Sequence, residues 1–131
     1  MKGYFDGASR GNPGEAGAGA LLTDDSGNVI WECAKYLGHK TNNEAEYNAV
    51  IMLLKEAKSR GIKELTICGD SKLVVSQLSH LWKIKMPHLR ELAIEAWSTA
   101  EGMNVKYIWV PREQNSRADK LSNEALDNAG K

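Results

Sequence analysis

The first forty residues carry short strand-like patterns separated by turn-forming residues. The pattern predicts strands at Lys2–Ala8, Ala16–Thr23 and Val29–Leu37. Residues 11–14 (GNPG) separate the first two, and their glycines and proline favour a turn. Residues 24–28 (DDSGN) separate the last two and favour a tight antiparallel connection. The N-terminal part of the chain therefore predicts three antiparallel strands.

The rest of the chain alternates between helical and strand-like patterns. A helix should begin at Thr41 and stop at Gly61, because Thr41 and Glu44 have the spacing of a capping box. The later elements are expected at Glu64–Gly69 (strand), Lys72–Leu81 (helix, after the cap Asp70-Ser71), Pro87 onward (amphipathic helix), Asn104–Val110 (strand, ending at Pro111) and Asn115–Asn128 (helix). This order predicts an α/β fold with a mixed sheet covered by helices.

Composition sets limits on the protein without naming a function. A length of 131 residues fits one domain. The 17 lysines and arginines balance the 17 acids, so any basic surface must be local. Cys33 and Cys68 lie too far apart to indicate a zinc site or a disulfide framework. With no stretch near the ~20 apolar residues of a membrane span, the sequence predicts a cytoplasmic protein without a membrane partner.

Four acids are candidate functional residues because of their positions in the predicted elements: Asp6, Glu46, Asp70 and Asp119. Asp6 lies in an otherwise apolar strand, and Glu46 heads the helical stripe that should face the core. Each also has an ordinary explanation. Asp6 can be an exposed strand residue, and Glu46 can be a first-turn acid that the helix dipole favours. Asp70 can be a helix cap, and Asp119 can belong to a surface ion pair. If the first and fourth strands are neighbours, however, the four acids could converge on one end of the sheet.

Such a cluster needs cations. Two carboxylates ~4 Å apart repel by roughly 4 kcal/mol at an effective dielectric constant near ~20, so several in one site must bind protons or metal. Oxygen ligands alone favour hard ions such as Mg²⁺ or Mn²⁺. A pair of these ions can activate water and stabilise the leaving oxygen in a displacement at phosphorus.

Four motifs, in order and rough spacing, resemble type 1 ribonuclease H: residues 6–14 (DGASRGNPG), 41–47 (TNNEAEY), 69–71 (GDS) and 117–119 (RAD). The first two together are highly specific, whereas the last two are weak alone. The resemblance covers essentially the whole chain and implies one catalytic domain over residues 1–131, with a five-stranded mixed sheet and helices on both faces. It also implies an endonuclease that hydrolyses the RNA strand of an RNA/DNA hybrid with two divalent ions, leaving 5′-phosphate and 3′-hydroxyl ends.

The resemblance assigns roles to individual residues. Its four metal-binding catalytic acids match Asp6, Glu46, Asp70 and Asp119. Asn12, Asn42 and Asn43 match positions that recognise the RNA strand near its 2′-hydroxyls, and Thr41 matches a contact to a DNA phosphate. Amide side chains suit this task because they donate and accept hydrogen bonds, as the 2′-hydroxyl does. Without the resemblance, turn and cap roles would be the preferred explanation for these asparagines.

The chain departs from many family members in two ways. The segment 110–115 (VPREQN) lacks the histidine that many members carry before the last aspartate, and Arg112 is the nearest replacement. An arginine cannot act as a general base, although it can hold a phosphate; Arg112 can equally be a surface residue. The chain is also too short between Leu81 and Pro87 for the long basic protrusion of some members.

A basic stretch offers partial compensation for the missing protrusion. Residues 71–90 contain no acid, and we expect nucleic-acid contacts from Lys72, Trp82, Lys83 and Lys85. The alternative, which the sequence slightly favours for Trp82, is a solvated helix with Trp82 in the core.

Three other functions compete with this interpretation: a hybrid-binding module without activity, another nuclease or strand-transfer enzyme on the same fold, and a nucleotide-binding loop at the N-terminus. The four acids favour an enzyme over an inactive module. The asparagines favour RNA, and the N-terminal segment has neither GxxxxGK[ST] nor GxGxxG. We expect a monomer; double-stranded RNA as a second substrate and the choice between Mg²⁺ and Mn²⁺ stay open.

Overall fold

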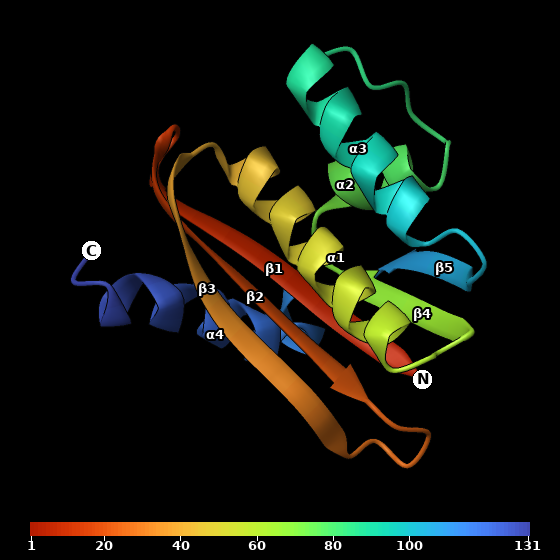
Figure 1. Cartoon of the computed structure of the whole chain (residues 1–131). Helices are drawn as coiled ribbons and strands as arrows, with labels where there is room; N and C mark the ends of the chain where they lie inside the picture. The colour runs from red at the N-terminus through yellow and green to blue at the C-terminus, as the bar shows by residue number, and fades with distance from the viewer.

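Three antiparallel strands open the chain in the structure, a computed structural model that describes residues 1–131 (Figure 1). They are β1 (Lys2–Gly11), β2 (Gly14–Thr23) and β3 (Val29–Lys40). The β1–β2 pairing runs to Gly11 opposite Gly14, which leaves only Asn12 and Pro13 in the turn. The predicted strands are confirmed but are longer than expected, because the backbone ladder continues through polar residues that the apolar pattern does not mark.

The rest of the chain supplies two more strands and all the α-helices. They are α1 (Asn42–Ser59), β4 (Glu64–Gly69), α2 (Lys72–Leu78), α3 (Pro87–Thr99), β5 (Asn104–Trp109) and α4 (Ser116–Asn128), with a 3₁₀ turn at Arg112–Gln114 before α4. The expected capping box is present: the hydroxyl of Thr41 accepts from the Glu44 N–H at 3.1 Å, and the Glu44 carboxylate accepts from the Thr41 N–H at 2.9 Å. None of these helices combines the length and apolar character needed to cross a membrane.

Helix α2 ends at Leu78, three residues before the expected end at Leu81. His80 has a φ of 63°, in the left-handed region, and the N–H groups of Leu81 and Trp82 turn back to the carbonyl of Ser76 at 2.9 and 3.2 Å. A left-handed residue just after a helix usually is glycine. Because a histidine occupies this position, no glycine marks the end of the helix, and the prediction was wrong for the last turn.

The sheet has the strand order β3-β2-β1-β4-β5. The pairs β1–β4 and β4–β5 are parallel, whereas β1–β2 and β2–β3 are antiparallel. This arrangement confirms the predicted five-stranded mixed sheet. It also makes β1 and β4 neighbours, the condition on which the convergence of the acids depended.

The two faces of the sheet pack against different helices. Side chains of Ala18, Ala20 and Leu22 on β2 belong to the main core with α1, while Gly17 and Gly19, on the opposite face of the strand, lie against α4. Figure 1 shows α1 across one face of the sheet, with α3 beside it, and α4 on the opposite face. The prediction of helices on both faces is therefore confirmed.

Candidate active site

Two of the predicted acids follow directly after the last paired residues of adjacent parallel strands. The β1–β4 pairing ends with Phe5 opposite Gly69, and the next residues are Asp6 and Asp70. Ligands bind in α/β proteins at the carboxyl ends of parallel strands. The register alone therefore places both carboxylates at the edge of the sheet where a ligand can reach them.

Glu46 reaches the same place from the first turns of α1. A Cβ on Gly7 would collide with the backbone of Ala45 and Glu46, so the glycine lets the helix approach β1 closely. The N–H of Gly7 donates to Oε1 of Glu46 at 2.5 Å, whereas Oε2 of Glu46 is buried without a hydrogen-bond partner. An inward-facing carboxylate thus starts the buried face of α1, as the helical spacing predicted.

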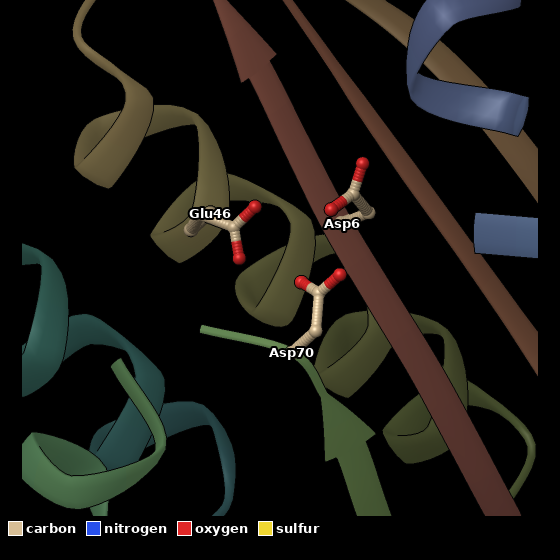
Figure 2. A group of neighbouring side chains, drawn as sticks. All are labelled: Asp6, Glu46 and Asp70. Carbon is tan, nitrogen blue, oxygen red and sulfur yellow. The ribbon is translucent and has the colours of Figure 1, made fainter. Parts of the chain in front are cut away.

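Asp6, Glu46 and Asp70 form a compact cluster of carboxylates. Each offers one oxygen, and these oxygens lie within 4.8 Å of one another. Figure 2 shows the three side chains converging from β1, α1 and the residue after β4. The side chains of Asp6 and Glu46 are only 5% and 6% exposed.

Burial and mutual repulsion hold the pKa values of this cluster high. Burial raises the pKa of Asp6 to about 7, assisted by the charges of Asp70 and Asp119 and opposed by a hydrogen bond from Ser122. Burial, with the neighbouring Asp6, raises the pKa of Glu46 well above its ordinary range. Burial also raises the pKa of Asp70, partly offset by the Arg112 guanidinium. Without a cation, the charged form of each of the three carboxyl groups is therefore energetically unfavourable.

The fourth acid, Asp119, lines the same cleft but lies outside the compact cluster. Its Oδ1 is 3.7 Å from Nη2 of Arg112, whose side chain is 80% exposed. The cleft has a volume of about 570 Å³, and Asn42, Asn43 and Trp109 also line it. The structure thus brings the four predicted acids and Arg112 to one cleft, with Asp119 turned toward the arginine.

The predicted RNA-binding asparagines occupy two kinds of position. Asn42 and Asn43 line the cleft, whereas the exposed Asn12 lies outside it in the β1–β2 turn. Oδ1 of Asn12 accepts from the N–H of Asn42 at 3.0 Å, and Oδ1 of Asn42 accepts from the N–H of Ser9 at 2.9 Å. These contacts tie the hairpin to the start of α1. Thr41 lies beside them and caps the helix.

The basic stretch divides between two places. The Lys72 ammonium lies 5.5 Å from the ring centroid of Trp109, at the cleft. Trp82 and Lys83 instead line a second cavity of about 450 Å³ between α2 and α3, and Lys85 is exposed outside both. Trp82 is 47% exposed and follows the end of α2, so the alternative that placed it in a helix and in the core is wrong.

Two buried residues that were not predicted from the sequence support the cluster. Asn115 is 1% exposed, and its Nδ2 donates to the carbonyl of Phe5 at 2.8 Å, just where β1 leaves β4. Ser122 is fully buried, and its hydroxyl donates to Oδ2 of Asp6 at 2.6 Å. Ser122 stands three residues after Asp119, a spacing that puts both on one helix face. That spacing was the available signal; nothing comparable marked Asn115.

The comparisons with known proteins agree with this geometry. The family described as reverse transcriptase-like matches residues 4–125. The curated "Ribonuclease HI" of Halobacterium salinarum is 44% identical over 127 residues, which cover 96% of this chain and 64% of the relative. The crystal structure of RNase H1 from the same archaeon has a TM-score of 0.94 and 42% identity, and the match covers 97% of each chain. This chain belongs to the type 1 ribonuclease H family.

A further type 1 ribonuclease H, LC11-RNase H1, has been solved in complex with an RNA/DNA hybrid. It is 38% identical to this chain, with a TM-score of 0.94 and coverage of 99% of both chains. The chain spans only 35% of the length of the mycobacterial relatives that it matches at 45% identity. Family membership therefore rests on one shared ribonuclease H unit.

Proposed function

We propose that residues 1–131 form a single catalytic domain that cleaves the RNA strand of RNA/DNA hybrids internally, with two divalent ions, leaving 5′-phosphate and 3′-hydroxyl ends. The observation that carries this proposal is the cluster of Asp6, Glu46 and Asp70 oxygens within 4.8 Å, where the parallel pairing of β1 and β4 ends, open to a cleft. The relatives named ribonuclease H and the hybrid bound to LC11-RNase H1 support the choice of substrate.

The donor set fits divalent metal ions. A buried acceptor without a partner, such as Oε2 of Glu46, is rare in native proteins and fits a ligand position. The raised pKa values of Asp6 and Glu46 mean that the charged cluster needs cations, and oxygen ligands favour Mg²⁺ or Mn²⁺. We assign the metal to Asp6, Glu46, Asp70 and Asp119. Two bound ions supply an activated water and stabilisation of the leaving oxygen.

The surrounding residues account for substrate selection. The amides of Asn42 and Asn43 face the cleft beside the acids and can exchange hydrogen bonds with a 2′-hydroxyl. Asn12 supports Asn42 from the hairpin turn, and Thr41 at the start of α1 is assigned to a DNA phosphate. The chain has no net charge, so attraction to the backbone comes from local groups, which we take to be Lys72, Lys83 and Lys85, with Trp82 packing against the nucleic acid. Because one chain supplies all the acids, we propose a monomer.

Matched duplexes test the substrate. RNA/DNA, RNA/RNA and DNA/DNA duplexes of one sequence are incubated with Mg²⁺ or with Mn²⁺, and the products of each strand are mapped. We expect cleavage of the RNA strand in the hybrid and none in DNA/DNA. Cutting of RNA/RNA would extend the substrate to duplex RNA, whereas equal cutting of DNA/DNA would contradict recognition of the 2′-hydroxyl.

Arg112 is proposed to hold the scissile phosphate or the departing product. Its guanidinium lies 3.7 Å from Asp119 at the exposed side of the cleft, where it can meet a phosphate. Arg112→Ala should lower kcat on the order of tenfold, the effect of losing about 1.5 kcal/mol from one charge-assisted hydrogen bond. Arg112→Lys should recover part of the loss, because it restores the charge without the planar fork.

The cleavage rate measured as a function of pH, on one hybrid substrate, distinguishes this role from its alternatives. An arginine cannot act as a general base, so Arg112→Ala should lower the rate and still keep a dependence on pH, shifted by the loss of the guanidinium that lowers the pKa of Asp70. Arg60→Ala, which removes an arginine from an exposed ion pair on α1, serves as the control. Equal rates of the parent and Arg112→Ala at every pH would make Arg112 a surface residue.

A further inference from the structure

Ser122 connects helix α4 to the acid cluster. It lies in the middle of α4, three residues after Asp119, and its side chain is fully buried. Its hydroxyl oxygen is 2.6 Å from Oδ2 of Asp6 and 2.8 Å from the backbone carbonyl oxygen of Asp119. One small side chain therefore contacts two of the four acids, at the carboxylate of one and at the backbone of the other.

The single proton of this hydroxyl belongs to the bond with Asp6. A serine hydroxyl has one hydrogen and can donate to only one acceptor at a time. A carboxylate is the stronger acceptor, and the short distance of 2.6 Å is typical of a charge-assisted bond. The carbonyl of Asp119 already accepts from Nδ2 of Asn123 at 3.0 Å. Ser122 thus holds Oδ2 of Asp6 and fixes the plane of that carboxylate.

Two glycines of β2 let Ser122 approach Asp6. A Cβ on Gly19 would lie 2.5 Å from the carbonyl oxygen of Ala118 and 2.6 Å from the nitrogen of Ser122, and one on Gly17 would lie 2.5 Å from the carbonyl oxygen of Ser122. The backbone of α4 therefore rests directly on β2 at this point. Gly19 is also the residue opposite Asp6 in the β1–β2 ladder. The close approach of α4 is centred on the strand pair that carries the acid.

We propose that Ser122 is a positioning residue that orients Asp6 for metal binding. The proposal rests on the assignment of Asp6 as a metal ligand. With Oδ2 held by the serine, the direction in which Oδ1 offers its lone pairs is set before an ion arrives. Partners that orient ligating carboxylates contribute to metal affinity without touching the metal, typically by roughly 10- to 100-fold. Ser122 also joins Asp6 to the helix that carries Asp119, so one contact aligns acids from opposite ends of the chain.

Removing the hydroxyl tests the proposal. Ser122→Ala leaves the helix and its packing in place, and α4 already carries alanine at the buried positions 118 and 125. Titration with Mn²⁺ alone, followed by calorimetry, should show an affinity at least about tenfold weaker than in the parent. The Mg²⁺ concentration that gives half-maximal hybrid cleavage should rise by a similar factor, while KM for the hybrid at saturating metal stays unchanged.

Two further variants separate orientation from packing. Ser122→Thr keeps the hydroxyl but adds a methyl group to a filled site, so it should melt at a lower temperature and yet bind Mn²⁺ with nearly the parent affinity. Ser76→Ala removes another buried serine hydroxyl, in α2 and away from the acids, and should match the parent in metal affinity.

The outcomes distinguish this inference from the proposed function. If the parent binds Mn²⁺ and cleaves the hybrid, and Ser122→Ala binds Mn²⁺ equally well, Ser122 only packs and the inference is overturned while the proposed function stands. A parent that binds no Mn²⁺ and cleaves in EDTA would overturn both. Weaker Mn²⁺ binding by Ser122→Ala, with affinity retained in Ser122→Thr and Ser76→Ala, supports the positioning role.

Discussion

Asp70→Asn is expected to remove nearly all hybrid cleavage while the protein stays folded. The amide keeps the shape of the side chain but loses the negative charge that holds a metal ion in the cluster with Asp6 and Glu46. The loss should be roughly a thousandfold, which corresponds to about 4 kcal/mol of transition-state stabilisation. The rate is measured at saturating Mg²⁺ on a single hybrid, next to a thermal melt of the same preparation.

The fold should survive because the asparagine side chain has nearly the size and shape of the Asp70 carboxylate, and its amide oxygen can still accept a hydrogen bond. The backbone carbonyl of Asp70 accepts from Nε1 of Trp109 at 3.3 Å, and this contact is unaffected by the substitution. Asp25→Asn is the matched control, since it makes the same chemical change at an acid in the β2–β3 turn whose side chain is 92% exposed. A rate for Asp70→Asn close to that of Asp25→Asn would place the active site elsewhere.

The second large effect concerns the metal-free protein, which Asp6→Asn should stabilise at pH 8. Burial raises the pKa of Asp6 from 3.8 to about 7 in the folded state. Folding therefore carries no penalty from this group below about pH 4, where the carboxyl is protonated in both states. The penalty grows as the pH rises through about 7, because the folded state must then hold a buried charge.

A neutral amide removes that penalty. At pH 8 in EDTA, Asp6→Asn should melt higher than the parent by on the order of 5 °C, since Glu46 and Asp70 remain and the full effect of the pKa shift is not recovered. The difference should shrink at pH 5. Added Mn²⁺ should reverse the order by stabilising the folded parent more than the variant. A variant that melts below the parent at pH 8 in EDTA would show that the carboxylate stabilises the metal-free fold.

The acids of the strands and of α1 could be predicted from the sequence because each follows a local pattern. Asp6 and Asp70 stand in or after apolar strands, and Glu46 heads an apolar helical stripe. The step from pattern to cluster required that β1 and β4 be neighbours, which the sheet order confirms. Local spacing therefore marked these acids as candidates, the family resemblance assigned them to a metal site, and the parallel register brings two of them together.

The features that the sequence did not reveal depend on contacts between distant elements. Ser122 meets Asp6 only because Gly17 and Gly19, on another strand, let α4 rest on β2. Helix α2 ends just before His80, whose backbone is in the left-handed region. Histidine is not a typical residue at such a position, so the sequence did not predict this end. The His80 ring stacks on Trp97, with 4.4 Å between the ring centroids. The spacing of Asp119 and Ser122 indicates that they share a helix face, but no pattern along the chain predicts the contact of Ser122 with Asp6.

The central claim is that this carboxylate cluster uses divalent ions to cut RNA paired with DNA. The most direct test is a hybrid whose RNA strand carries a 5′ label, incubated with the protein in Mg²⁺, in EDTA, and in EDTA followed by excess Mg²⁺. We predict shortened 5′-labelled RNA fragments with 3′-hydroxyl ends in Mg²⁺, none in EDTA, and their return when Mg²⁺ is restored. Undiminished cleavage in excess EDTA, or an intact RNA strand under all three conditions, would contradict the claim.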